Sequence, residues 1–220
     1  IITNLYNSKD SDSLSEGTFA NIGTFITVAN YKIAKQIGNL KTYYKNYDEY
    51  VLEDIALEVN LTKESFAKKR NAIYIPKIGN SNVVADIAMT TLKHQNYFQV
   101  VVDKEKVSNK YLEVFFKSDL GKLSLRAITK GAYIASRTKS DLLEIRLPIP
   151  DTDSQETITN TYEKIESLKL SINQFESDLS LNPDSAVSIL STLDNALDSI
   201  GSLNQEDQLL AMIRAGETKT

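Results

Sequence analysis

The spacing of apolar residues changes at Pro150, and this change limits the folds that the chain can adopt. After Pro150, apolar residues recur at steps of three and four, which places them on one face of an α-helix. These residues are Ile158, Tyr162, Ile165, Leu168, Ile172, Phe175 and Leu179. Because the steps come close to a heptad repeat, the stripe predicts a helix of coiled-coil character. Asn182 and Pro183 are expected to break this helix, and a second stripe from Ala186 to Ile200 predicts a further helix.

Before Pro150 the chain alternates between helical and β patterns. Helical spacing occurs in residues 33–44, 51–59 and 107–128, and Ser108 is a start signal for the last of these helices. The β-rich runs are residues 71–79, 82–92, 96–103 and 142–150. The sequence therefore predicts an α+β fold with a mixed sheet, followed by a helical, coiled-coil-like C-terminal segment.

The charge is distributed unevenly along the chain. Residues 60–139 contain 15 Lys and Arg against 6 Asp and Glu, whereas residues 151–220 contain 4 against 13. The formal net charge of −4 for the whole chain hides this asymmetry. A basic middle and an acidic tail indicate a body that binds a polyanion and an appendage with another role. We therefore expect three regions: a lead-in loop and helix over 1–50, a binding domain over 51–150 and a helical segment over 151–220.

Several classes of protein are excluded by residues and motifs that the sequence does not contain. It has no Cys and a single His, His94, so disulfides, Cys-ligated metals and multi-histidine metal sites are excluded. It has no nucleophile elbow, phosphate-binding loop or dinucleotide fingerprint. No apolar run reaches the roughly 18 residues of a membrane span, and no leader of the secretory kind follows Ile1. We expect a non-catalytic, cytoplasmic part of a longer protein that uses no cofactor or metal and contacts no membrane.

The basic residues fall into groups that suit contact with nucleic acid. Long cationic side chains bind phosphates, while Asn, Gln and His side chains in loops can read base edges. A single residue of these types is more often a solvated surface group, so the prediction depends on the whole set. The candidate DNA-binding residues are Lys68, Lys69, Arg70, Lys77, Asn80, Asn82, Lys93, His94, Gln95, Lys122, Arg126, Lys130, Arg137 and Lys139.

The order of elements from about Val51 to Leu179 resembles the target recognition domain of type I restriction–modification specificity subunits. The stretch VLEDIALEV resembles the lead-in of that domain, and IYIPKIGN resembles its first strand and turn. A more specific match lies further on, in a helix, a glycine, a strand that ends in Pro-x-Pro, and a following Gln. The matching residues are Tyr111, Leu112, Ser118, Gly131, Leu142, Ile145, Pro148, Pro150, Gln155 and Ile158.

The resemblance implies sequence-specific binding to double-stranded DNA, with methylation or cleavage left to other domains or subunits. It makes residues 51–150 the recognition domain and residues 151–220 a spacer that pairs with a second copy. The implied partners are therefore double-stranded DNA and either a second copy in a homodimer or methyltransferase or restriction subunits. A full specificity subunit has two recognition domains and two long helices, whereas this chain has one of each. The link LPIPDTDSQ is also more polar than its counterpart in the family, so we expect a half-subunit or a fused module.

Two alternative interpretations remain open. The chain is the C-terminal part of a fused DNA adenine methyltransferase or restriction enzyme, or it is a protein-interaction module that works through its helical tail. The final stretch LLAMIRAGETKT also resembles the residues that precede an AlbA-type ATP-binding domain in Schlafen-like proteins. That resemblance implies an effector other than the usual methyltransferase.

Overall fold

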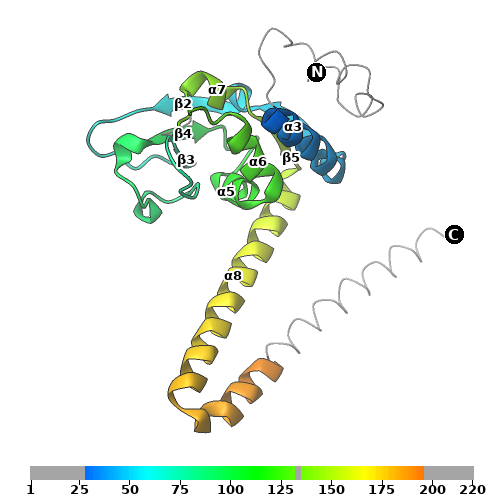
Figure 1. Cartoon of the computed structure of the whole chain (residues 1–220), viewed down its shortest axis with the longest axis vertical. Helices are drawn as coiled ribbons and strands as arrows, with labels where there is room; N and C mark the ends of the chain where they lie inside the picture. The colour runs from blue at the N-terminus through cyan, green and yellow to red at the C-terminus, as the bar shows by residue number, and fades with distance from the viewer. Residues whose placement is uncertain (1–27, 132–134, 196–220) are drawn as a thin grey trace, which may run out of the picture. The chain divides into compact units, whose positions relative to one another are not determined.

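The computed structural model describes residues 28–131 and 135–195 (Figure 1). The chain divides into two compact units, Ile1–Tyr162 and Glu163–Thr220. The helices are α3 (Val28–Lys41), α4 (Leu52–Ile55), α5 (Asn109–Lys117), α6 (Asp119–Ala127), α7 (Lys139–Leu143) and α8 (Thr152–Leu181). The strands are β1 (Asp48–Val51), β2 (Ala56–Asn60), β3 (Ala72–Pro76), β4 (Tyr97–Val102) and β5 (Arg146–Ile149). Short 3-10 helices are η2 (Thr42–Tyr44), η3 (Ile87–Met89), η4 (His94–Asn96) and η5 (Pro183–Ser185).

Two small antiparallel sheets organise the described part of the first unit. β4 lies between β2 and β3 in one sheet, and β1 pairs with β5 in the other. All residues of β3 are buried: Ile73 faces the main core, while Tyr74 packs with Phe66 and Tyr97 in a second cluster. Burial on both faces explains why this stretch is a continuous apolar run without alternation. The α+β class is thus confirmed, with two antiparallel sheets in place of the single mixed sheet that we expected.

The helix expected over residues 107–128 is divided into α5 and α6 at Ser118. The Ser118 hydroxyl donates to the Phe115 carbonyl at 2.6 Å and accepts a hydrogen bond from the Gly121 N–H at 3.2 Å, so this residue both ends α5 and caps α6. A Cβ on Gly121 would lie 2.1 Å from the Phe115 carbonyl oxygen, which makes glycine necessary at this bend. Ser108 caps α5, as the sequence predicted.

Two sequence predictions in the first half were wrong in part. The helix expected over residues 51–59 ends at Ile55, because the residues that follow form β2 and pair with β4. The strand expected over residues 82–92 is replaced by a turn into η3, whose N-cap is the Asp86 side chain. In both places the apolar pattern extends over only a few residues. A strand partner in the first case and a capping side chain in the second therefore decide the local structure.

The residues of the more specific sequence match meet where β5 ends and α8 begins. The Tyr111 hydroxyl donates to the Pro148 carbonyl at 2.6 Å. Gln155 is 3% exposed; it accepts a hydrogen bond from the Ser108 N–H and donates to two backbone carbonyls, each at 2.9 Å. These bonds join α5, β5 and the first turns of α8 within the first unit.

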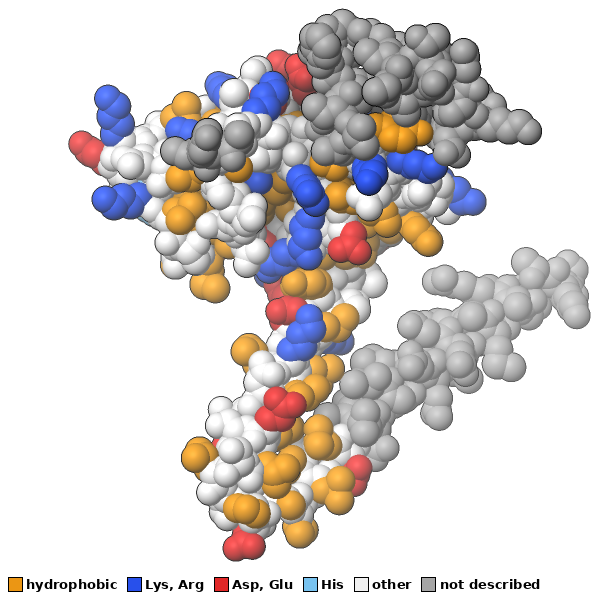
Figure 2. All heavy atoms as spheres, in the orientation of Figure 1, with side chains coloured by type: hydrophobic (Ala, Val, Ile, Leu, Met, Phe, Trp, Pro, Cys, Tyr) orange, Lys and Arg blue, Asp and Glu red, His pale blue; other side chains and the backbone are white. Residues whose placement is uncertain are grey.

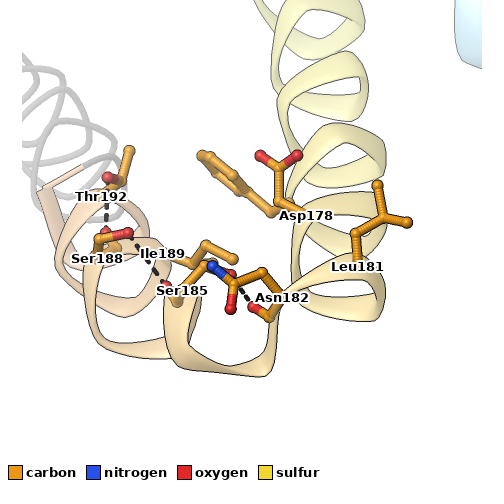
Figure 3. A pocket seen from close by; sticks show the side chains of 8 residues that line it. Asp178, Leu181, Asn182, Ser185, Ser188, Ile189 and Thr192 are labelled. Carbon is orange, nitrogen blue, oxygen red and sulfur yellow. Dashed lines mark hydrogen bonds between the residues drawn. The ribbon is translucent and has the colours of Figure 1, made fainter.

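The second unit is helical in its described part, residues 163–195. The α8 helix ends at Leu181, and the Asn182 side chain accepts a hydrogen bond from the Asp184 N–H at 3.2 Å to start η5. Helical structure continues over residues 186–195, beside the last turns of α8 (Figure 3). The break predicted at Asn182 and Pro183 is confirmed, and the capping side chain is that of Asn182.

Residues 28–55 belong to the same compact unit as the centre of the chain, because α3 packs against α6 and β1 pairs with β5. The three-part division at residues 50 and 150 stays a prediction about functional regions. The end of the second apolar stripe, Leu197 and Ile200, lies outside the described residues, as does the stretch 209–220. Within the described ranges, no helix has both the length and the apolar character needed to cross a lipid bilayer.

Candidate nucleic-acid interface

A groove of about 630 Å³ opens on the first unit beside α6. Its walls come from α3, the turn after β3, the α5–α6 pair and residues 135–137. Figure 2 shows Lys and Arg side chains on the face where Figure 1 places α5 and α6. The groove brings together five of the residues predicted to bind DNA. These are Asn80, Asn82, Lys122, Arg126 and Arg137.

Lys122 and Arg126 lie one turn apart on α6, and both are exposed. Burial of Leu120 and Leu125, which are 2% and 7% exposed, fixes the rotation of this helix. Neither cation forms an ion pair with another residue in the part of the chain that the structure describes. Both positive charges are therefore available to an anion that enters the groove.

Asn80 and Asn82 lie in the turn that follows β3. Gly79 starts this turn with φ +66°, a left-handed conformation that favours glycine, and its N–H donates to the Ala135 carbonyl at 3.2 Å. Both Asn side chains are exposed and make no hydrogen bond to other described residues. Because an amide can donate and accept at once, these side chains have the chemistry that reads base edges.

A second group of candidates gathers where two loops touch. The Phe66 N–H donates to His94 Nδ1 at 3.0 Å, and the two rings stack with their centres 5.6 Å apart. This contact holds the loop before β3 against η4. The group consists of Lys68, Lys69, Arg70, Lys93, His94 and Gln95. Within it, Lys69 is paired with Glu58, and the Nδ1 atom of His94 is already occupied by its bond to the Phe66 backbone.

Lys77 lies between the two groups, at the end of β3. Its Nζ donates to the Gln95 carbonyl at 3.2 Å and lies 5.8 Å from the centre of the Phe98 ring. Its backbone carbonyl accepts a hydrogen bond from the Arg137 N–H at 2.8 Å. Lys77 therefore contacts Arg137, which lines the groove, and Gln95 of the second group at the end of β3, whereas Lys68, Lys69 and Arg70 precede the start of that strand.

The two remaining candidates, Lys130 and Lys139, do not line the groove. Lys130 Nζ lies 2.7 Å from the Asp141 carboxylate, and the hydrogen bond from Lys130, with one from Thr138, lowers the pKa of Asp141 below its usual value. Lys139 Nζ donates to the Val59 carbonyl at 3.5 Å. DNA contact by these lysines stays a prediction, and it requires each to leave a partner within the fold.

Lys117 also lines the groove, although it was not among the residues predicted to bind DNA. Its Nζ lies 2.8 Å from the Glu113 carboxylate and 5.1 Å from the centre of the Tyr162 ring, so its charge is already compensated. The four-residue spacing of Glu113 and Lys117 is the sequence signal for this pair. In residues 28–131 and 135–195, no three carboxylate or imidazole side chains gather as metal ligands.

The apolar stripe of α8 has two environments. Ile158 packs against the core of the first unit, and Tyr162 is half-buried. Ile165, Ile172 and Leu179, seven residues apart, are 44%, 46% and 45% exposed. These three side chains form a solvent-facing row at heptad spacing.

Comparison with known proteins gives a distant structural likeness. No protein-family model matches the sequence, and no curated protein matches it either. Among solved structures, the chain is similar to the type I restriction–modification system S subunit from M. genitalium, with 18% sequence identity and a TM-score of 0.48. The alignment covers 69% of this chain and 47% of that one, so this chain spans about half the length of that subunit.

Proposed function

We propose that this chain binds a specific double-stranded DNA sequence and acts as the specificity module of a restriction–modification system. The groove beside α6 carries the proposal. In it, two cations without an ion pair among the described residues, Lys122 and Arg126, share one opening with the amides of Asn80 and Asn82. Cations supply affinity for the phosphates, and amides distinguish the bases.

In this proposal the chain selects the DNA but does not alter it. Methyltransferase and restriction subunits, or domains fused to this chain, act on the selected site. The sequence resemblance supports this role, since the matching residues Tyr111, Pro148 and Gln155 join α5, β5 and α8 through hydrogen bonds. They hold α5, one of the helices that line the groove.

The exposed row Ile165, Ile172 and Leu179 supports pairing of α8 with the same helix of a second copy. As a helix, the stripe from Ile158 to Leu179 spans about 33 Å. This length is close to one turn of B-DNA. The expected target is therefore two half-sites about one helical turn apart.

The test is selection of bound sequences from a randomised duplex pool by the full chain, at two salt concentrations. We expect an enriched motif whose binding weakens as salt rises. The slope of log K against log salt is negative. The double variant Lys122→Gln/Arg126→Gln should reduce its magnitude by about 2, because two phosphate contacts are lost. The variant Asn80→Ala/Asn82→Ala should instead reduce discrimination between sequences and leave that slope nearly unchanged.

The matched control is Lys45→Gln/Lys104→Gln, which removes the same charge from two exposed residues that do not line the groove. Equal salt slopes for the control and for the groove variant would contradict the assignment of the groove. Salt-sensitive binding without an enriched motif would contradict sequence recognition. A folded chain that binds no duplex at low salt would instead favour a protein-interaction module.

A further inference from the structure

Arg137 is a buried cation without a carboxylate partner among the described residues. It is 8% exposed. Its Nη1 donates to the Pro76 carbonyl at 2.9 Å and to the Gly79 carbonyl at 3.3 Å, and its Nε donates to the Leu125 carbonyl at 3.3 Å. One guanidinium thus ties the end of β3 and the following turn to the last turns of α6.

These bonds leave part of the guanidinium unused. No described residue forms a hydrogen bond with Nη2 of Arg137. No buried side-chain nitrogen or oxygen in the described part of the chain lacks a partner, so Nη2 must retain access to solvent. Arg137 also lines the groove beside α6, together with Lys122 and Arg126.

The charge of this guanidinium is only partly compensated. Burial disfavours the charged form and lowers the pKa of Arg137, although arginine stays protonated at neutral pH. Carbonyl dipoles, including that of Leu125 near the negative end of α6, offset some of this cost. The helices α5 and α6 carry two acidic residues. Glu113 is bound to Lys117, and Asp119 lies in the first turn of α6, at the opposite end of that helix from Leu125. An anion that enters the groove would supply the missing counter-charge.

We propose that Arg137 is the fixed anchor of a phosphate-binding site in this groove, with Lys122 and Arg126 as its outer cations and a DNA backbone phosphodiester as its ligand. The inference depends on the proposed function. Since the same guanidinium holds the Gly79 carbonyl, a phosphate bound there also positions the turn that carries Asn80 and Asn82. Phosphate contact and base contact are thereby coupled through one side chain.

The test scans the selected duplex with single methylphosphonate substitutions, each of which removes one phosphate charge. Wild-type protein should lose about tenfold in affinity at one position in each half-site, as expected for a charge-assisted hydrogen bond. Arg137→Lys keeps the charge but loses the planar fork, so it should bind the unmodified duplex about tenfold more weakly, and the methylphosphonate at that same position should lower its affinity by clearly less than in wild type. Circular dichroism and urea unfolding check that this variant is folded.

A second variant keeps the test valid if Arg137→Lys does not fold. Lys122→Gln/Arg126→Gln changes exposed residues, and it should also reduce the methylphosphonate effect at that position. Wild-type binding that is equally tolerant of every methylphosphonate would overturn the inference while leaving sequence recognition intact. A rise in melting temperature with inorganic phosphate, without any sensitive position on the duplex, would also overturn it, because the ligand would then be a free anion. Failure of the proposed function is distinct: no duplex sequence is enriched.

Discussion

The two compact units bury their apolar side chains to very different extents. In the first unit, side chains of β3, β4 and α5 form a core in which most residues are almost fully buried. In the described part of the second unit, Leu170, Leu181, Val187 and Leu190 are 70%, 82%, 80% and 60% exposed. Apolar surface that stays in water contributes nothing to folding. We infer that the first unit is stable through its own core, whereas the second gains stability when another surface covers it.

The polar groups show the same contrast. The first unit contains buried polar side chains, Gln99, Arg137, Gln155 and Thr159, and each is hydrogen-bonded. In the described second unit, polar contacts such as that of Gln174 with Asp178 at 2.7 Å are exposed to water. Loss of a polar partner should therefore be costly in the first unit and nearly neutral in the second.

The largest effect is expected for Gln155→Leu. The substitution leaves one N–H and two carbonyls of the first unit without their partner, and it should lower the free energy of unfolding by about 3 kcal/mol. Urea unfolding followed by circular dichroism measures this change. Gln174→Leu is the matched control on the same helix, and it should change the same quantity by less than about 0.5 kcal/mol. Equal effects of the two substitutions would contradict the inference that losing a polar partner costs more in the first unit than in the second.

A smaller effect is expected for Tyr111→Phe. Its hydroxyl donates to the Pro148 carbonyl, and burial raises the pKa of Tyr111, so the hydroxyl remains a donor at all ordinary pH values. Removing it should cost about 1 kcal/mol in the same unfolding experiment. Tyr43→Phe removes a hydroxyl from a residue that is 82% exposed and should have no measurable effect. Indistinguishable results would mean that the junction at Pro148 does not stabilise the first unit.

The pH dependence of the stability of the first unit tests an ion pair on its surface, whereas the two preceding substitutions test its interior. The hydrogen bonds from Lys130 and Thr138 lower the pKa of Asp141 in the folded state. The resulting stability is present above the ordinary Asp pKa of about 4 and is lost as the pH falls through the lower, folded value. Because Lys130 is 70% exposed, solvent limits the contribution to less than about 1 kcal/mol.

Unfolding at pH 5 and at pH 3 measures this contribution. Wild-type protein should lose slightly more stability over that interval than Asp141→Asn, whose side chain does not titrate. In 1 M salt the difference should shrink, because the pair is partly screened. An identical pH dependence of the two proteins would show that the Lys130–Asp141 pair adds nothing to the first unit.

The smallest effect on the first unit is expected for Ile172→Ser/Leu179→Ser. Both side chains are nearly half exposed and belong to the second unit, so unfolding of the first unit should change by less than about 0.5 kcal/mol. Sedimentation equilibrium should at the same time show weaker self-association than in wild type. A loss of more than 1 kcal/mol from the first unit would show that the two units are not energetically independent.

The sequence predicted elements whose signals are local. The spacing from Ile158 to Leu179 predicted a continuous helix, and the structure confirms it within α8. The β-rich run over residues 96–103 predicted a strand, which is β4. Asn182 and Pro183 predicted the helix break. In each case a side-chain period, a cap or a missing N–H acts within a few residues, so neighbours along the chain are sufficient.

Only the tertiary structure decided which candidate residues share a site. From sequence, Arg137 was one basic residue among fourteen candidates, whereas in the fold it is buried against Pro76, which lies 61 residues away. His94 likewise owes its contact with Phe66 to a separation of 28 residues. Periodicity shows which face of an element is apolar, but it does not show which distant donor meets which acceptor. Composition and period thus determined the class of fold and the basic character of the domain, and long-range packing determined where its cations and amides meet.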